Sequence, residues 1–439
     1  MAETTRTPIG KIVGASLIGT TIEWYDFFLY GSAAALIFPK LFFPESEPLT
    51  GTLLAFLTYA VGFVARPLGA LVFGHYGDRL GRKKLLVVSL LMMGGATFLI
   101  GCLPTHAAIG AAAPLLLTVL RLVQGFALGG EWGGAVLIVS EHGDARRRGY
   151  WASWPQAGAP GGNLLATAVL AVLAAVQTDE AFQSWGWRVP FLLSGVLVLV
   201  GMWIRLSISE SPIFQQAVAG REPAPSLPIV DVIKYHWRDV LIAIGARFAE
   251  NVSYYVITAF VLVYATTSAG LSKPVVLNAV LIGSAVHFVS IPLWGALSDR
   301  LGRRPVYLLG AAGVGLWAFA FFPLIDTGNF AAITLAVTVG LVLHGAMYGP
   351  QAAFFSELFA TRMRYSGVSI GSQLASIVAG GLAPLIAVAL LDAYGSALPV
   401  MLYVLGAAVL TLITMYVARE TRGRDLVTLG GVDEATTPR

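Results

Sequence analysis

Two carboxylates, Glu23 and Asp26, stand in an apolar stretch of sequence that runs from residue 12 to residue 38. A charge at the centre of a bilayer costs about 2.5–3.5 kcal/mol, so such residues usually serve a function. Because they are three residues apart, the two acids share one helix face and interact. Like charges in a low dielectric resist joint ionisation, so one acid can exchange a proton near neutral pH. We expect Asp26 to carry that proton and Glu23 to tune it or to contact a solute.

Further ionisable and aromatic residues in apolar stretches extend this chemistry. Glu131 and Glu250 are additional candidates for a proton site. Tyr30 follows Asp26 by four residues, so its phenol is placed to hydrogen-bond to that acid. Phe27 and Phe28 are interpreted as packing residues. The aromatic residues expected to line a solute site are Trp24, Tyr30, Tyr254 and Tyr255.

Three arginines, Arg66, Arg121 and Arg247, lie within apolar stretches and are potential partners for an anion. A guanidinium is well shaped to bind a carboxylate through two hydrogen bonds. Arg247 precedes Glu250 by three residues, so the two can pair until a solute carboxylate competes for the guanidinium. Asn251 adds an amide at the same depth. We predict that Arg247 and Asn251 bind solute, and that Arg66 braces helix packing.

The sequence contains little that suggests an enzyme. It holds one cysteine and six histidines, and His287 and His344 are isolated in apolar stretches, where we interpret them as packing residues. No H-E-x-x-H metal motif and no G-x-x-x-x-G-K-[ST] nucleotide loop occurs. We therefore expect no enzymatic activity, no metal, no cofactor and no drive by ATP.

These residues must be held by membrane-spanning helices. Hydrophobic residues make up 56% of the 439 residues and charged residues only 12%, against about 25% charged in soluble domains, and the mean hydropathy is +0.76. A spanning helix needs about 20 mostly apolar residues and satisfies its own backbone. The sequence thus predicts an all-α membrane protein with twelve transmembrane helices. The stretches are 12–38, 53–75, 84–103, 113–140, 149–176, 188–207, 238–267, 275–297, 305–325, 331–357, 365–391 and 397–418.

The basic residues indicate how the helices are oriented. Most Lys and Arg residues fall in alternate loops and in both terminal segments, whereas the other loops hold only Lys40, Arg188 and Lys273. Positively charged loops remain in the cytoplasm. We therefore expect both termini to be cytoplasmic in a multi-pass protein of a bacterial inner membrane. Nucleic-acid binding is not needed to explain the positive charge.

The sequence repeats itself after six predicted helices. The segment "GHYGDRLGRKK" (74–84) recurs as "GALSDRLGRRP" (295–305), each after the second helix of six. The same offset places Asp26 and Arg247 at equivalent positions. The pattern predicts two pseudo-symmetric six-helix bundles, at 1–207 and 238–439, joined by a polar cytoplasmic linker at 208–237. Repeats of this kind usually hold the solute between them near the bilayer midplane. We therefore expect Asp26 to face Arg247 across the solute site.

The duplicated G-x-x-x-D-R-x-G-R-[RK] loop resembles the signature of the major facilitator superfamily. Within it, "IEWYDFFLYG" (22–31), "ARPLGALVFGHYGDRLGRKK" (65–84) and "RLVQGFALGGEWGGA" (121–135) resemble the metabolite:proton symporters. That family includes permeases for shikimate, α-ketoglutarate, citrate, and proline or betaine. The segments "SESPIF" (209–214) and "RETRGRDL" (419–426) resemble the sugar porters, and "GAPGG" (158–162) partly resembles a pattern of antiporters. The resemblance implies that Arg121 is a coupling or solute-binding residue.

The resemblance also implies a gate at the cytoplasmic side. Asp78 would pair with basic residues at the start of a helix in the other half, near Arg364. Asp299 would pair in the same way with the start of a helix in the first half, near Arg148. These contacts would form when the site faces outward and break when it faces inward. The residues assigned to this gate are Gly74, Asp78, Arg79, Gly81, Arg82, Arg148, Asp299, Arg300, Gly302, Arg303 and Arg364.

The sequence thus favours a secondary transporter that moves a small organic solute with protons by alternating access. The available arginines favour a small carboxylate metabolite. Two alternatives remain: a proton-coupled transporter of a zwitterionic osmolyte, whose cation would use the aromatic residues and acids of 23–28, or a facilitator of a neutral solute that needs no proton. The expected partners are the solute, protons and the lipid bilayer, and we expect a monomer.

Overall fold

The computed structural model describes residues 8–80, 82–129, 144–206, 236–359 and 364–424, together with 132, 135, 136, 139, 140 and 234. Within these residues the regular structure is entirely helical. Most of the predicted linker, 208–237, lies outside them. Nine of the described helices are long and apolar enough to cross a membrane, and a bent pair, Asp179–Gly186 with Arg188–Ile204, adds a tenth.

The first half of the chain forms six long helices, each of which matches a predicted span. Short helices connect some of them, and the chain bends where η2 meets α10. The long helices are α1 (Ile9–Leu36), α3 (Pro48–Leu80), α4 (Arg82–Cys102), α6 (Ala112–Gly129), α8 (Arg148–Val176) and α10 (Arg188–Leu206). The short ones are α2 (Phe38–Phe42), α5 (His106–Ile109), η1 (Ala145–Arg147), α9 (Asp179–Ala181) and η2 (Phe182–Gly186).

The second half also forms six spans, two of which are interrupted. The uninterrupted ones are α15 (Lys273–Leu301), α16 (Arg303–Asp326), α17 (Phe330–Leu358) and α20 (Leu398–Val417). The others are α13 (Trp237–Tyr255), η3 (Val256–Phe260) and α14 (Val261–Thr267), and α18 (Arg364–Ala375), η4 (Ser376–Gly381) and α19 (Ala383–Tyr394). Both η3 and η4 are turns of π-helix. The twelve predicted helices are therefore confirmed, with breaks that the sequence did not predict.

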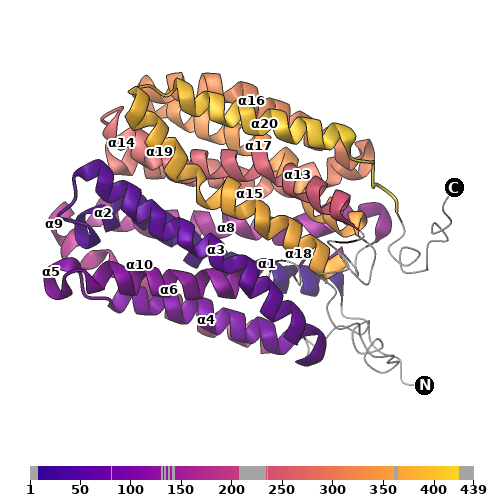
Figure 1. Cartoon of the computed structure of the whole chain (residues 1–439), viewed down its shortest axis with the longest axis horizontal. Helices are drawn as coiled ribbons and strands as arrows, with labels where there is room; N and C mark the ends of the chain where they lie inside the picture. Colours follow the sequence, from indigo (N-terminus) through magenta and orange to yellow (C-terminus); the bar gives the residue numbers. More distant parts are fainter. Residues whose placement is uncertain are drawn as a thin grey trace.

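The helices lie alongside one another and gather into two groups (Figure 1). Helices α1, α3, α4, α6 and α10 lie on one side of the picture, and the helices from α13 to α20 lie on the other. The two groups meet where α8 of the first half packs against α15 of the second. Large apolar side chains such as Trp203, Leu316 and Leu293 remain exposed on outer faces. Such a surface suits the acyl chains of a bilayer.

Glycines allow several helices to touch backbone to backbone. A Cβ atom at Gly125 of α6 would overlap the carbonyl oxygen of Gly62 in α3, and one at Gly129 would overlap that of Arg66. A Cβ at Gly162 of α8 would likewise overlap the α1 backbone at Tyr25. Gly125 and Gly129 thus allow close contact between α6 and α3, and the "GAPGG" segment serves contact between α8 and α1.

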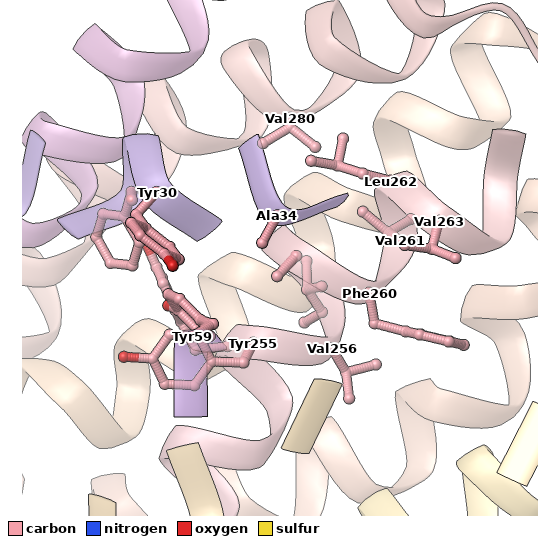
Figure 2. Packing of buried hydrophobic residues seen from close by; sticks show 14 of the residues in the cluster. Tyr30, Ala34, Tyr59, Tyr255, Val256, Phe260, Val261, Leu262, Val263 and Val280 are labelled. Atoms are coloured by element: carbon pink, nitrogen blue, oxygen red, sulfur yellow. The ribbon is translucent and has the colours of Figure 1, made fainter. Parts of the chain in front are cut away.

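A cluster of buried apolar residues lies where α1 meets the broken helix α13–η3–α14. Figure 2 shows Ala34 of α1 close to Leu262 of α14 and Val280 of α15. Tyr30, Tyr59 and Tyr255 lie together on the other side of the same view. Helix α14 contacts both α1 and α15 at the end of the bundle away from Arg148 and Asp299 (Figure 1).

Candidate functional site

Asp26 lies at the centre of α1 and is completely buried. Its Oδ1 accepts a hydrogen bond of 2.5 Å from the Ser194 hydroxyl of α10. Its Oδ2 has no hydrogen-bond partner among the described residues. Glu23, one turn earlier, is also buried. The acid therefore points into the first group of helices, and the prediction that Asp26 faces Arg247 is wrong.

Arg121 of α6 is linked to the surroundings of Asp26 by two polar side chains. Its Nη1 donates to Oε1 of Gln124 over 3.0 Å, and Nε2 of Gln124 donates to the hydroxyl of Thr97 over 2.7 Å. Thr97 in turn lies beside Asp26. Nε and Nη2 of Arg121 have no partner among the described residues. The i, i+3 spacing of Arg121 and Gln124 could have revealed this link, but the neighbours on α4 and α10 could not be read from spacing.

Aromatic rings surround the Arg121 guanidinium. Its Cζ lies 4.3 Å from the ring centre of Phe27, 4.4 Å from Tyr30 and 4.5 Å from Tyr59. The Tyr30 hydroxyl lies 2.7 Å from the hydroxyl of Thr58. The predicted hydrogen bond from Tyr30 to Asp26 is therefore wrong, because the phenol turns toward α3 while its ring covers the guanidinium.

Arg66 of α3 is a second buried cation in the same aromatic region. Its Cζ lies 4.0 Å from the ring centre of Phe63, 4.3 Å from Phe27 and 5.9 Å from Trp24. Its Nε and Nη2 have no hydrogen-bond partner within the described part of the chain. A guanidinium that only braced helices would use these donors. Of the two roles considered for Arg66, these free donors favour that of an anion partner over that of a brace.

Arg247 and Glu250 of α13 form the predicted ion pair, with 3.6 Å between Nε and Oε2. Asn251 donates to the same Oε2 over 3.1 Å. Gln351 of α17 binds both partners, because Nη1 of Arg247 donates to its Oε1 over 3.3 Å and its Nε2 donates to Glu250 over 3.2 Å. The Arg247 guanidinium also lies 5.3 Å from the ring centre of Trp132. No sequence pattern indicated Gln351, because it lies on a helix that is distant in the chain.

Aromatic rings join the two groups of polar residues. Trp24 stacks on Phe28 at 5.0 Å between ring centres, and Phe28 meets Tyr254 at 5.3 Å. Phe63 meets Tyr255 at 5.5 Å. Trp24, Tyr254 and Tyr255 therefore lie where the two halves meet. Phe28 joins them although it was assigned to packing.

His287 and His344 are both buried and lie against each other, so neither is isolated. Nδ1 of His344 lies 2.9 Å from Nε2 of His287, and Nε2 of His344 lies 3.4 Å from Oε1 of Glu250. Their helices, α15 and α17, are neighbours. Within the described ranges, no three His, Cys, Asp or Glu side chains are grouped as they would be around a metal ion.

A network of charges lies where α8 and α16 begin, and we call this end of the molecule the basic end. Asp299 accepts hydrogen bonds from the backbone N–H groups of Gly149 at 2.8 Å and Tyr150 at 2.9 Å, in the first turn of α8. It also pairs with Arg303 at 2.7 Å. Asp299 thus lies at the predicted helix start, because the carboxylate is attracted to free N–H groups there.

Glu357 completes this network. It is fully buried and pairs with Arg148 at 3.0 Å and with Arg303 at 3.1 Å. The Thr421 hydroxyl donates to the same carboxylate over 2.9 Å. Gly302, with φ of 107°, makes the turn between α15 and α16, where other residues would be strained. Arg300 is exposed, and its carbonyl oxygen accepts from Arg422.

Several predicted residues cannot be placed in this way. Glu131 and Gly81 lie outside the described residues. Gly74, Asp78, Arg79, Arg82 and Arg364 fall within helices, but their side chains are also outside the described part.

The profile of the Major Facilitator Superfamily matches residues 16–384 and again 284–432. The chain belongs to the major facilitator superfamily. Its similarity to curated members extends over nearly the whole length. It is 42% identical over 428 residues to the "Inner membrane metabolite transport protein YhjE" of Escherichia coli, covering 96% of this chain and 97% of that protein. It is 40% identical over 410 residues to the shikimate transporter of the same organism, covering 93% and 94%.

More distant members share the fold. A proline/betaine transporter of Salmonella typhimurium is 33% identical over 427 residues, covering 95% of this chain and 84% of that protein. The proton:xylose symporter XylE bound to 6-bromo-6-deoxy-D-glucose superposes with a TM-score of 0.73 at 16% identity, covering 96% and 98%. As a member of this superfamily, the protein is a multi-pass membrane transporter of small organic solutes and not an enzyme.

Proposed function

We propose that this protein is a proton-coupled symporter of a small organic carboxylate that works by alternating access. The observation that carries the proposal is the pair of buried guanidiniums, Arg66 and Arg121, which lie against one ring and keep N–H donors without partners among the described residues. Buried donors are rarely left unpaired. A carboxylate would accept hydrogen bonds from them and offset their charge.

Asp26 supports the proton-coupled part of the proposal. A buried carboxyl group with one oxygen free of hydrogen bonds can hold a proton, and the neighbouring Thr97 accepts from Gln124, which binds Arg121. Protonation of Asp26 would leave Arg121 with less compensating charge nearby. The guanidinium would then bind an anionic solute more strongly, which couples the proton to the solute.

The same geometry disfavours the zwitterionic alternative. A quaternary ammonium would need open aromatic faces, and those of Phe27, Phe63 and Tyr59 already carry Arg66 or Arg121. Some relatives are named as proline/betaine transporters, so this alternative belongs in the test. A neutral solute would give the unpaired guanidinium donors no charged acceptor, which disfavours the proton-independent facilitator.

We further propose that the basic end faces the cytoplasm of a bacterial inner membrane. Arg146, Arg147, Arg304 and Arg422 lie at this end, which fits the bias of basic residues toward the cytoplasm. The contact of Asp299 with α8 and the Arg148–Glu357 pair would then hold the cytoplasmic side closed. Release of these contacts would open the site inward.

Uptake by purified protein in liposomes tests the proposal. With an acidic exterior, labelled shikimate, citrate and α-ketoglutarate are compared with glycine betaine and xylose. We expect at least one carboxylate to accumulate. Accumulation of glycine betaine alone would replace the proposal by the zwitterionic alternative, and equilibration of xylose without any effect of the pH gradient would support the facilitator.

A pair of variants links uptake to the site. Arg66→Gln should raise the KM for the transported carboxylate by about tenfold or more, because a hydrogen bond to a charged group contributes about 1.5–3 kcal/mol. Arg238→Gln removes an exposed arginine at the start of α13 and should leave the KM unchanged. Equal KM values for Arg66→Gln and the wild type would show that Arg66 does not bind the solute.

A further inference from the structure

Three buried titratable side chains from three helices form a continuous hydrogen-bonded row. His287 of α15 lies 2.9 Å from His344 of α17, which lies 3.4 Å from Glu250 of α13. Their exposed fractions are 0%, 1% and 4%. The two imidazole rings are close to perpendicular, at 71°. We name these three residues the His–His–Glu row.

The chemistry of the groups fixes the direction of the hydrogen bonds. An ionised carboxylate only accepts, so Nε2–H of His344 donates to Glu250. A neutral imidazole has one donor and one acceptor, so Nδ1 of His344 accepts from Nε2–H of His287. Nδ1 of His287 is then an unprotonated nitrogen, and it has no hydrogen-bond partner among the described residues. The row therefore ends in a basic ring nitrogen that can accept a proton.

We propose that the His–His–Glu row is a second proton site, in which a proton that binds His287 is relayed through His344 and stored on Glu250. An N–H bond forms at Nδ1 of His287, and its Nε2–H proton moves to Nδ1 of His344. The Nε2–H proton of His344 then moves to Oε1 of Glu250. One proton has entered, both rings are again neutral with exchanged tautomers, and Glu250 has become a carboxylic acid.

The stored proton would act on Arg247. Ionised Glu250 holds this guanidinium at 3.6 Å, and Gln351 binds both groups. A neutral Glu250 no longer balances the charge of Arg247, which becomes available to the carboxylate of a solute. Because such coupling is reciprocal, the bound solute would also retain the proton. This consequence rests on the proposed function, whereas the relay itself does not.

The surroundings of the row contain one facing cation and several phenols. Arg247 is the charged group against Glu250. The neutral side chains described next to the row are Tyr254, Tyr255 and Asn251 on α13, Ser290 on α15, Tyr348 and Gln351 on α17 and Tyr307 on α16. Gln156 and Asn163 of α8, Ser284 of α15 and Phe28 of α1 form the next layer, because they contact Tyr348, each other and Tyr254.

Infrared titration of the protein in nanodiscs without solute tests the relay. The carboxylic acid C=O band of Glu250 is identified by its absence in Glu250→Gln. We expect this band to grow in the wild type as the pH is lowered. His287→Gln keeps an N–H donor toward His344 but cannot bind the proton, so the band should be lost or its midpoint should shift by more than about one pH unit.

A matched control separates the relay from packing. Ser290→Ala changes a buried polar side chain on the same helix, whose hydroxyl donates only to the His287 carbonyl oxygen. In Ser290→Ala the carboxylic acid band of Glu250 should show the same midpoint as in the wild type. An unchanged midpoint in His287→Gln, or no Glu250 band in the wild type, would overturn the proposal.

The tautomers provide a readout that needs no variant, should His287→Gln fail to fold. Nitrogen-15 NMR of histidine-labelled wild-type protein should show two of the six histidines exchanging the protonated ring nitrogen between high and low pH. Fixed tautomers throughout the titration would overturn the relay. Neither titration contains solute, so failure of the relay is distinguishable from failure of carboxylate symport, which the uptake panel tests.

Discussion

At the scale of single residues, Asp26 is the group that should connect the proton to the solute. Asn at this position keeps the shape of the side chain and an oxygen for the Ser194 hydroxyl, but it cannot bind and release a proton. We predict that Asp26→Asn abolishes accumulation driven by a pH gradient, while exchange of labelled for unlabelled solute continues within about twofold, because exchange needs no net proton movement. Paired uptake and counterflow assays in liposomes measure both.

Glu23→Gln is the control for this change. It removes the neighbouring buried carboxylate on the same helix, and it should preserve accumulation with a shifted pH profile. If Asp26→Asn still accumulates solute like the wild type, Asp26 does not carry the proton. If Glu23→Gln instead shows the loss, the roles of the two acids are exchanged.

Local spacing predicted some contacts of these residues and missed others. The Arg247–Glu250 pair followed from their i, i+3 positions on one helix. The hydrogen bond from Ser194 to Asp26 and the His287–His344 contact join helices that are distant in sequence. Such contacts depend on the rotation and tilt of each helix. A single sequence encodes these only through many weak packing terms.

At the scale of elements, close contact between α3 and α6 places Arg66 and Arg121 against the same ring. Gly125→Ala would push its Cβ into the Gly62 carbonyl oxygen. We expect a loss of stability of about 1–3 kcal/mol, the usual cost of overpacking, and weaker solute binding because the guanidiniums move apart. Thermal unfolding in detergent and the KM of uptake measure these effects.

Gly406→Ala is the matched control, because a Cβ at Gly406 of α20 would meet no atom within 4 Å. It should unfold at the wild-type temperature or slightly above, since alanine favours a helix more than glycine does. Equal stability of Gly125→Ala and Gly406→Ala would show that α3 and α6 can separate without cost.

Glu420 stabilises the start of α16 in a manner that depends on pH. Burial alone would raise the pKa of Glu420, but backbone N–H groups of Arg422, Arg303, Arg304 and Thr421 donate to its carboxylate and lower the pKa below its ordinary value. The ionised form is therefore favoured in the folded protein. Its contribution to stability is complete above the ordinary value of about 4.3 and is lost as the pH falls through the lowered value.

Glu420→Gln should accordingly lower the unfolding temperature at neutral pH, with a difference from the wild type that shrinks below about pH 4.3. Unfolding curves recorded across this range measure the difference. A difference that stays constant with pH would mean that the charge of Glu420 does not stabilise α16.

The sequence predicted the positions of the helices better than the irregular turns within them. Each of the twelve apolar stretches became a helix because length and hydropathy determine a span. The π-helical turns η3 and η4 were not predicted, because one extra residue in a turn leaves the apolar composition unchanged. Such turns are frequent at functional sites, and η3 directly follows Tyr254 and Tyr255.

At the scale of the whole molecule, the basic end ties the two halves together. Asp299→Asn removes the charge that binds the start of α8, so the closed arrangement of this end should lose population. We predict that a longer distance between the ends of α8 and α15 then becomes more populated. Spin labels at Arg147→Cys and Leu301→Cys, both exposed positions, measure it after Cys102→Ser removes the native thiol.

The control for this change is Asp392→Asn, an exposed acid on α19. It should leave the distance distribution as in the otherwise unmodified protein. Identical distributions in Asp299→Asn and the control would show that Asp299 does not hold the basic end closed.

Proton flux during solute uptake tests the central claim most directly. The protein is placed in liposomes that contain a pH-sensitive dye, without an imposed gradient, and the carboxylate that it transports is added outside. We predict that the interior becomes acidic at a rate that follows solute uptake, and that Asp26→Asn abolishes this signal. Uptake of the carboxylate by the wild type without acidification of the interior would contradict proton symport.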